Sequence, residues 1–220
     1  MSRTIRHIHK LAVLALAVAG LLAWPASASA QTVSGSASAV QANVLGVTTA
    51  LADTGPLADA ADLREASEMA AGILSLGSAD VLHAATGSSV TNGGGSDYVA
   101  SEASLADAGL AVAGNFISAA FVMARATAPA GGSPVGTSEI DGLSINGVPV
   151  IVTGQPNQTV WLLGGRVILN EQVPTSTGMT VNAVHVIVGG VADVVLAAAS
   201  AGSGGSSGSP LPLPPFPSLF

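Results

Sequence analysis

Alternating apolar and polar positions are clearest over residues 140–200, where they predict short antiparallel strands joined by tight turns. Apolar residues alternate with polar ones across positions 143–152, on both sides of Asn146-Gly147. Asn-Gly is a strong hairpin signal because both central residues of a type I′ turn need positive φ. Pro149 has no backbone N–H to donate, which favours a position at the edge of a sheet.

Two more hairpins are predicted towards the C-terminus, each turned at a glycine pair that permits positive φ. Their strands and turns are residues 159–163 and 166–170 around Gly164-Gly165, and residues 181–188 and 191–198 around Gly189-Gly190. The last two strands are nearly continuous in small and branched apolar residues. This pattern is typical of strands that are covered on both faces.

The first half of the chain has a weaker pattern. Residues 36–47, 73–85 and 98–126 have strand character with glycine breaks. Residues 60–71 are rich in helix formers, so a short helix there competes with an irregular strand. The uncharged run 108–124 resembles a membrane helix, but its length and the interruption at Asn115 favour strands. The fold class predicted is all-β, an antiparallel β-sandwich or jelly-roll-like single domain with at most one short helix.

The N-terminal 30 residues have the three parts of a secretory signal peptide. Three basic residues precede an uncharged apolar run over residues 11–22, and small residues follow. Ala28 and Ala30 occupy the positions that a signal peptidase reads, so cleavage is predicted before Gln31. The alternative, a retained membrane anchor, is disfavoured because the run is shorter than the roughly 20 residues that span a bilayer.

The remaining chain is predicted to be one β-rich domain over residues 31–201 with a tail over residues 202–220. Residues 202–209 are only glycine and serine, which is typical of a flexible linker. The prolines between residues 210 and 217 favour polyproline II geometry. A solvated tail is favoured over a spacer that threads through a cell wall.

Charge and composition narrow the range of partners. From Gln31 onward the chain has three arginines, no lysine and thirteen acidic residues, which gives a net charge of −10. Such a surface repels phosphate backbones and anionic membranes, so no nucleic-acid partner is expected. The chain has no cysteine, so no disulfide stabilises it. Its apolar residues are mainly Ala, Val and Leu, whose small side chains favour closely packed sheets.

No catalytic set emerges from the sequence. Only His83 and His185 follow the predicted signal peptide, and each lies in an alternating apolar segment, where a strand-surface or partly buried histidine is favoured over a general base. Residues 204–208 match the nucleophile-elbow pattern, but that motif needs a strained strand-to-helix turn and this copy lies in the linker.

Metal and cofactor sites are not predicted either. Two distant histidines without cysteine do not make a zinc signature. The glycine-rich segment 92–97 resembles one calcium repeat, but such sites need stacked copies. Four acidic residues could hold calcium weakly, but a solvated helix face is favoured; they are Asp59, Asp62, Glu65 and Glu68. From Gln31 onward no lysine is present to complete a phosphate-binding loop, and no cofactor is expected.

Trp161 is the one residue singled out as a candidate ligand contact. It lies in a predicted strand beside the Gly164-Gly165 turn, and planar aromatic side chains are platforms for carbohydrates. The sequence allows two placements of this side chain, exposed as a binding platform or buried in the core. Burial in the core is the more frequent outcome for a lone tryptophan. Tyr98, Phe116 and Phe121 are the other aromatic residues of the domain.

Several segments resemble choice-of-anchor P proteins. These segments are Ile145-Asn-Gly-Val-Pro-Val, Thr153-Gly-Gln-Pro-Asn-Gln-Thr-Val160, Val167-Ile-Leu-Asn-Glu-Gln172, Met179-Thr-Val-Asn-Ala-Val-His-Val186, Gly190-Val-Ala-Asp-Val-Val195, Ser101-Glu-Ala-Ser-Leu105 and Phe116-Ile-Ser-Ala-Ala120. The resemblance implies a bacterial exported β-domain without established enzymatic activity, and it supplies no catalytic residues. Anchored members carry varied C-terminal sorting signals, whereas this chain ends in a proline-rich tail.

The function expected from these features is that of a secreted protein of the cell surface or extracellular matrix. It would act through protein or glycan contacts, without enzymatic activity and without a membrane span after signal cleavage. A self-assembling structural subunit is the alternative, because long apolar strands with few charges leave sheet edges that can accept another strand. A secreted hydrolase is the least supported hypothesis.

Overall fold

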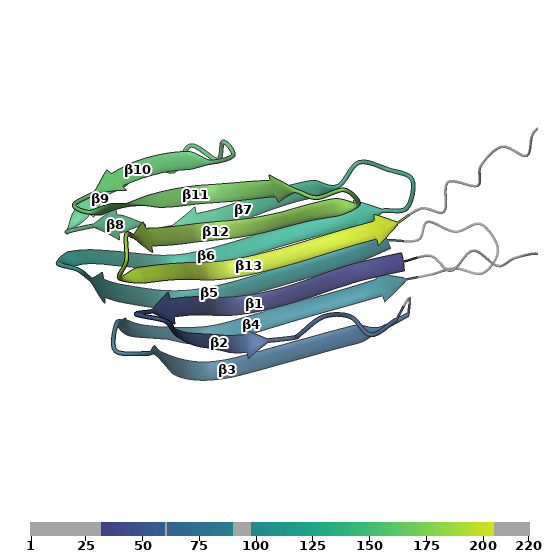
Figure 1. Ribbon diagram of the computed structural model, residues 1–220, viewed down its shortest axis with the longest axis horizontal. Helices are drawn as coiled ribbons and strands as arrows, with labels where there is room; N and C mark the ends of the chain where they lie inside the picture. The colour runs from purple at the N-terminus through teal and green to yellow at the C-terminus, as the bar shows by residue number, and fades with distance from the viewer. Residues whose placement is uncertain (1–31, 60, 90–97, 205–220) are drawn as a thin grey trace, which may run out of the picture. The chain divides into compact units, whose positions relative to one another are not determined.

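Two antiparallel sheets make up the part of the chain that the computed structural model describes, residues 32–59, 61–89 and 98–204 (Figure 1). All of these residues belong to the compact unit Gln31–Phe220. Sheet A has the strand order β10-β11-β12-β13-β1-β2, and sheet B has the order β3-β4-β5-β6-β8-β9, with β7 also paired to β6. The strands are β1 (Thr32–Val44), β2 (Val47–Asp53), β3 (Leu63–Ile73), β4 (Gly77–Ser89), β5 (Tyr98–Val112), β6 (Asn115–Pro129), β7 (Val135–Asp141), β8 (Ser144–Ile145), β9 (Val148–Pro149), β10 (Gln158–Leu162), β11 (Gly165–Pro174), β12 (Gly178–Val188) and β13 (Ala192–Gly204).

The two sheets pack face to face, which confirms the predicted all-β sandwich. The central strand β13 of sheet A lies against β5 and β6 of sheet B. Ala, Val, Leu and Ile side chains fill the space between the sheets, and no aromatic side chain is among the buried hydrophobic residues of the described ranges. The sheets approach closely at Gly35, where an added Cβ would lie 2.7 Å from Oγ1 of Thr86 and 2.9 Å from Cγ1 of Val99.

Each long strand changes its pattern of burial once, near its middle. In β5 the buried positions are odd-numbered up to Leu105 and even-numbered from Ala108 onward. Asp107 lies between them with a φ of 45°. A residue in the left-handed region interrupts the period-2 alternation of a strand, because it turns the following side chains to the other face. The same change occurs in β1 after Ala39 and in β12 after Ala183.

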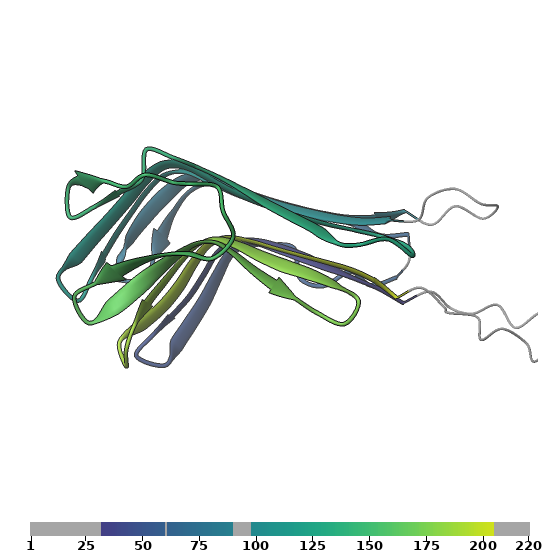
Figure 2. The same ribbon diagram turned by 90° about the horizontal axis from the view of Figure 1, so that it is seen from above.

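The interruptions line up from strand to strand across sheet A. In sheet A they form a row that we call the bend line of sheet A: Ala52, Ala39, Ala197, Ala183 and Asn170. Alternate members of this row have positive φ, 44° at Ala52, 57° at Ala197 and 50° at Asn170. In sheet B, Val81 and Asp107 have positive φ within β4 and β5. As a result, both sheets bend in the same direction partway along their strands (Figure 2).

The bend corrects one prediction about the last two strands. β13 is indeed buried on both faces, since Val195 and Ala198 on its outer side are almost covered. β12 is not, because Asn182, His185 and Ile187 on its outer side are only partly buried. Its run of adjacent apolar residues marks the change of face at the bend line.

The short helix considered for residues 60–71 is wrong. Leu63–Ile73 is β3, the edge strand of sheet B, and it pairs with β4 from Leu63↔Gly87 to Ile73↔Gly77. Pairing with β4 overrides the local helix propensity of this segment, as tertiary context often does.

The predicted hairpins are present with small changes. Asn146-Gly147 turns β8 into β9, and Pro149 lies in the edge strand β9 of sheet B as predicted. The alternation predicted as far as residue 152 ends early, because β9 stops at Pro149. The uncharged run 108–124 is the β5–β6 hairpin, turned at Ala113-Gly114. In the described residues no helix is long and apolar enough to cross a membrane.

Several predictions concern residues outside the described ranges: the signal peptide with Ala28, Ala30 and Gln31, the calcium-like segment 92–97, most of the elbow-like segment 204–208 and the proline-rich tail. At the C-terminal boundary, β13 continues to Gly204, three residues beyond the predicted end of the domain at residue 201.

Candidate functional site

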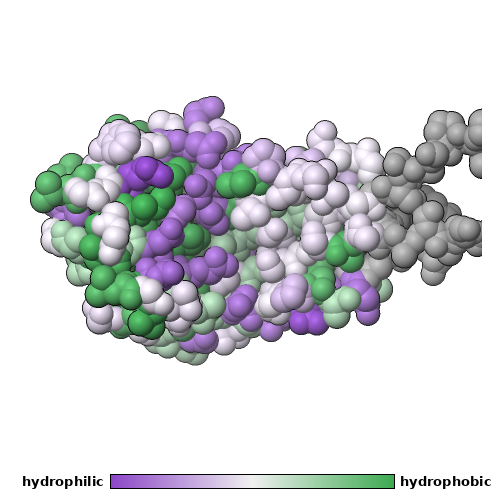
Figure 3. Space-filling model, in the orientation of Figure 1, coloured by the Kyte–Doolittle hydropathy of each residue, from purple (hydrophilic) through white to green (hydrophobic). Residues whose placement is uncertain are grey.

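The outer face of sheet A is the concave side of its bend (Figure 2). It carries polar side chains from β1, β11, β12 and β13. The strand register places five outward residues in one row near the turns. In order across the sheet they are Trp161, Arg166, Ile187, Asp193 and Asn43. Figure 3 looks onto this face and shows hydrophilic residues in a band across it, beside hydrophobic residues at one end.

His185 is the centre of a hydrogen-bonded cluster on this face. Its Nδ1 lies 2.7 Å from Oε2 of Glu171, and its Nε2 lies 2.8 Å from Oδ1 of Asp193. Asn182 donates from Nδ2 to the same Glu171 oxygen at 2.7 Å. The four residues come from β11, β12 and β13, so the cluster ties three neighbouring strands together. We call it the His185 cluster.

The geometry of the His185 cluster suits hydrogen bonding to a ligand, or holding the three strands together, better than it suits nucleophilic catalysis. Both ring nitrogens face carboxylate oxygens, so neither is directed at a hydroxyl group, as the general base of a catalytic triad must be. The side chains of His185 and Glu171 are 14% and 17% exposed, whereas Asp193 is largely exposed. The cluster therefore presents a fixed carboxylate to solvent beside a largely covered imidazole. His83, by contrast, forms a peripheral pair with Glu65 at 3.2 Å.

A polar hollow lies at the bend, beside the His185 cluster. It has a volume of about 220 Å³. Its polar lining consists of Ser36, Gln41, Thr180, Asn182 and Ser200, with Ala198 between them. Hydroxyl and amide groups both donate and accept hydrogen bonds, so this lining suits a ligand that is itself rich in hydroxyl or amide groups.

Trp161 lies at the rim of this face and is 76% exposed, so the core position considered for it is wrong. The sandwich fills its core with small aliphatic side chains, and Trp161 is directed outward from β10, which is an edge strand of sheet A. Its cross-strand partner is Arg166. Tyr98 and Phe116 are also about half exposed, and Phe121 is partly buried.

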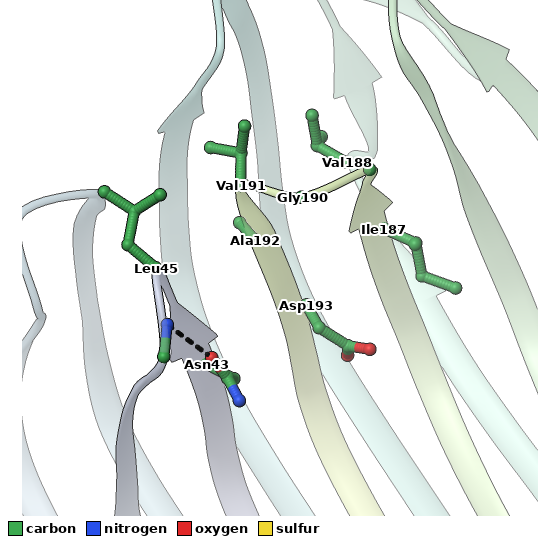
Figure 4. Close-up of a pocket in the computed structure, with 10 residues that line it drawn as sticks. Asn43, Leu45, Ile187, Val188, Gly190, Val191, Ala192 and Asp193 are labelled. Atoms are coloured by element: carbon green, nitrogen blue, oxygen red, sulfur yellow. Dashed lines mark hydrogen bonds between the residues drawn. The ribbon is translucent and has the colours of Figure 1, made fainter.

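A second hollow, of about 360 Å³, lies between the β1–β2 and β12–β13 turns (Figure 4). Leu45 and Val191 stand on its two sides, and Asn43 and Asp193 lie deeper along β1 and β13 (Figure 4). The Asn43 side chain accepts a hydrogen bond from Gly46 N–H at 3.1 Å, which fixes the β1–β2 turn. This hollow is apolar at the turns and polar only towards the sheet.

The four acidic residues considered as a weak calcium site do not converge. Asp59 and Asp62 lie before β3, Glu65 pairs with His83, and Glu68 accepts a hydrogen bond from Ala52 N–H. The helix face favoured for them is also absent, since this segment is a strand. Across the described ranges, no group of three or more metal-ligating side chains is placed to hold a metal ion.

Asp62 acts as a loop anchor. Its carboxylate accepts a hydrogen bond from Ala58 N–H at 2.8 Å and pairs with the Arg64 guanidinium at 2.8 Å. These two interactions, the backbone bond first, hold the pKa of Asp62 below its ordinary value. The ion pair fixes the segment that leads from sheet A into β3.

The partners of His185 were missed by sequence reasoning, although a signal for them was present. Once the Gly189-Gly190 hairpin is assigned, its register places Asp193 opposite Ile187, two positions from His185 and on the same face. The Gly164-Gly165 hairpin does not reveal Glu171 in the same way. Glu171 lies beyond Asn170, where the bend line changes which face the side chains occupy.

Comparison of the chain with known protein families, with curated proteins and with solved structures gives no match.

Proposed function

We propose that this chain is an exported, non-enzymatic protein of the cell surface or extracellular matrix that binds a protein or glycan partner through the outer face of sheet A. The observation that carries the proposal is the concave polar face with exposed Trp161 at its rim. The signal-peptide pattern of the first 30 residues and the resemblance to choice-of-anchor P proteins support export.

The arrangement of groups on this face suits such contacts. An exposed indole offers a flat apolar surface for a sugar ring or a side chain. The hydroxyl and amide groups of the polar hollow, together with the carboxylates of the His185 cluster, provide directional hydrogen bonds. Because the cluster is bonded across three strands, little conformational freedom is lost when a partner binds.

The test is binding of the Gln31–Phe220 unit to an array of bacterial surface glycans and to immobilised cell-envelope proteins. Trp161→Ala is expected to weaken binding about thirtyfold, since an aromatic side chain that becomes buried against a partner can contribute about 2 kcal/mol or more. Asn182→Ala, which removes a side chain of the polar hollow, is expected to weaken it about tenfold.

The matched control is Glu102→Gln, which breaks the Glu102–Arg125 pair on the outer face of sheet B. This variant should bind like the unchanged protein. Equal binding by all four proteins would show that the partner does not use the outer face of sheet A, and would remove the proposal.

Self-assembly through a sheet edge is a second candidate, and it rests on a different observation. β3 is an 11-residue edge strand whose side chains are mostly exposed on both faces, including Leu63 and Met69. Unpaired backbone groups along such an edge can add a strand from another molecule. The charges of Arg64, Glu65 and Glu68 on the same strand work against uncontrolled pairing.

A proline on this edge provides the test. In the unchanged protein, sedimentation velocity is expected to show oligomers that increase with concentration. Proline blocks the pairing at a position whose backbone N–H points away from β4. Both Ala66→Pro and Ser67→Pro are therefore measured. If the unchanged protein stays monomeric at millimolar concentration, self-assembly through β3 is ruled out.

A further inference from the structure

Six hairpin turns lie at one end of the sandwich, on the left in Figure 1. We call this the hairpin end. Its turns are Leu45-Gly46 (β1–β2), Leu74 to Leu76 (β3–β4), Ala113-Gly114 (β5–β6), Asn146-Gly147 (β8–β9), Leu163-Gly164 (β10–β11) and Gly189-Gly190 (β12–β13). None of these turn residues is charged, although the chain has thirteen acidic residues. Turns are usually built from Gly, Pro, Asn, Asp and Ser, so the leucines in three of these turns are unusual.

Large apolar side chains project from these turns into solvent. Leu45 is 76% exposed and Leu163 is 84% exposed. Val47, Phe116 and Val148, which lie beside these turns, are at least half exposed. Figure 3 shows hydrophobic residues gathered at this end of the molecule. Apolar residues scattered singly over a surface are ordinary, but a gathered set marks a contact surface.

The backbone of the hairpin end is hydrogen-bonded from turn to turn. These bonds are Leu45 N–H to Val191 O (3.0 Å), Asn146 N–H to Phe116 O (2.7 Å), Phe116 N–H to Asn146 Oδ1 (2.8 Å), Asn115 Nδ2 to Leu163 O (3.2 Å) and Gly189 N–H to Gly164 O (3.3 Å). Each bonded backbone group no longer needs water. This lowers the cost of moving the turns into an apolar medium, where unpaired backbone groups are expensive.

We propose that the hairpin end inserts its apolar side chains into the interfacial layer of a lipid surface with uncharged or zwitterionic headgroups. The apolar, charge-free turns and their internally bonded backbone fit such a surface. The net charge of −10 from Gln31 onward disfavours anionic headgroups. Trp161 lies just behind the turns, and tryptophan is enriched at the level of lipid headgroups.

The chain's own C-terminal segment is a poorer occupant of the hairpin end. β13 runs away from the turns for 13 residues, roughly 43 Å, and ends at Gly204. Gly204 therefore lies at the end of the sandwich opposite the hairpin end (Figure 1). A second copy of the chain is an alternative occupant that the experiment below distinguishes.

The experiment is flotation of the Gln31–Phe220 unit with phosphatidylcholine vesicles, followed by tryptophan fluorescence. Trp161 is the only tryptophan from Gln31 onward, so its emission reports on this end directly. Binding with a blue shift of the emission is expected. Leu45→Ser combined with Leu163→Ser should lower the partition coefficient about a hundredfold, roughly tenfold for each leucine withdrawn from lipid.

Leu63→Ser combined with Val135→Ser is the matched control, because both residues are exposed and apolar but lie away from the hairpin end. This pair should leave vesicle binding unchanged. The proposal is overturned if the unchanged protein does not float with the vesicles, or if the control pair reduces binding as much as the hairpin-end pair. Sedimentation of the lipid-free protein separates the alternative: a dimer that only the hairpin-end pair dissociates, without vesicle binding, would assign the surface to a second copy.

Discussion

Replacing Ala197 by valine is expected to destabilise the protein by about 3 to 5 kcal/mol, whereas glycine at this position is expected to leave stability unchanged or raise it by up to about 1 kcal/mol. Ala197 is fully buried in the middle of β13 and has a φ of 57°. The left-handed region costs a residue with a Cβ about 1 to 2 kcal/mol, and a branched side chain more. Valine adds the cost of overpacking, about 1 to 3 kcal/mol. Glycine relieves the backbone strain at this position but removes one buried methyl group, whose burial contributes about 0.8 kcal/mol.

Ala199 provides the comparison, because it is equally buried two residues further along the same strand and its φ is not positive. Ala199→Gly should cost about 1 to 2 kcal/mol, from the flexibility of glycine and the lost methyl group. Urea unfolding of the three variants and the unchanged protein measures these differences. If Ala197→Gly is as harmful as Ala199→Gly, the bend of sheet A does not depend on a left-handed residue in β13.

The bend explains which parts of the fold the sequence predicts. Turns that use Asn146-Gly147 or glycine pairs are evident because glycine and asparagine are the residues that tolerate positive φ. Ala52, Ala197 and Val81 also have positive φ, yet nothing in their residue type indicates it. Their conformation is imposed by the neighbouring strands, so it follows from the packing of whole sheets. A period-2 pattern read along one strand cannot show where the alternation changes face.

The same limit applies to the candidate site. The place of Trp161 beside a turn makes it a candidate contact in the sequence. The structure adds that Trp161 is exposed, because the core is filled by aliphatic side chains. In the sequence His185 is a lone histidine in an apolar segment. Its partners Glu171 and Asp193 come from two other strands, and Glu171 reaches the outer face only because Asn170 reverses the pattern in β11.

Gly165→Ala is expected to destabilise the protein by about 3 kcal/mol, clearly more than Gly164→Ala, at about 1 to 2 kcal/mol. The sequence predicts that both glycines form one tight turn, but the structure gives them different roles. Gly164 has a φ of 76°, and nothing lies within 4 Å of a Cβ added there, so alanine would meet only backbone strain. A Cβ at Gly165 would lie 2.1 Å from the carbonyl oxygen of Ile187 and 3.0 Å from Cα of Val188.

That contact is with the backbone of β12, so no side-chain rotation can relieve it, and β11 must move away from β12 at their turn end. The ladder there would lose the pairing Gly165↔Val188 and weaken Arg166↔Ile187, the row that leads to Trp161. Thermal unfolding of both variants measures the stability difference, and hydrogen exchange of the Val167 and Val186 amides locates it. Faster exchange is expected in Gly165→Ala alone. Equal stability of the two variants would mean that Gly165 serves only the turn, and that β11 and β12 do not need a glycine for their close approach.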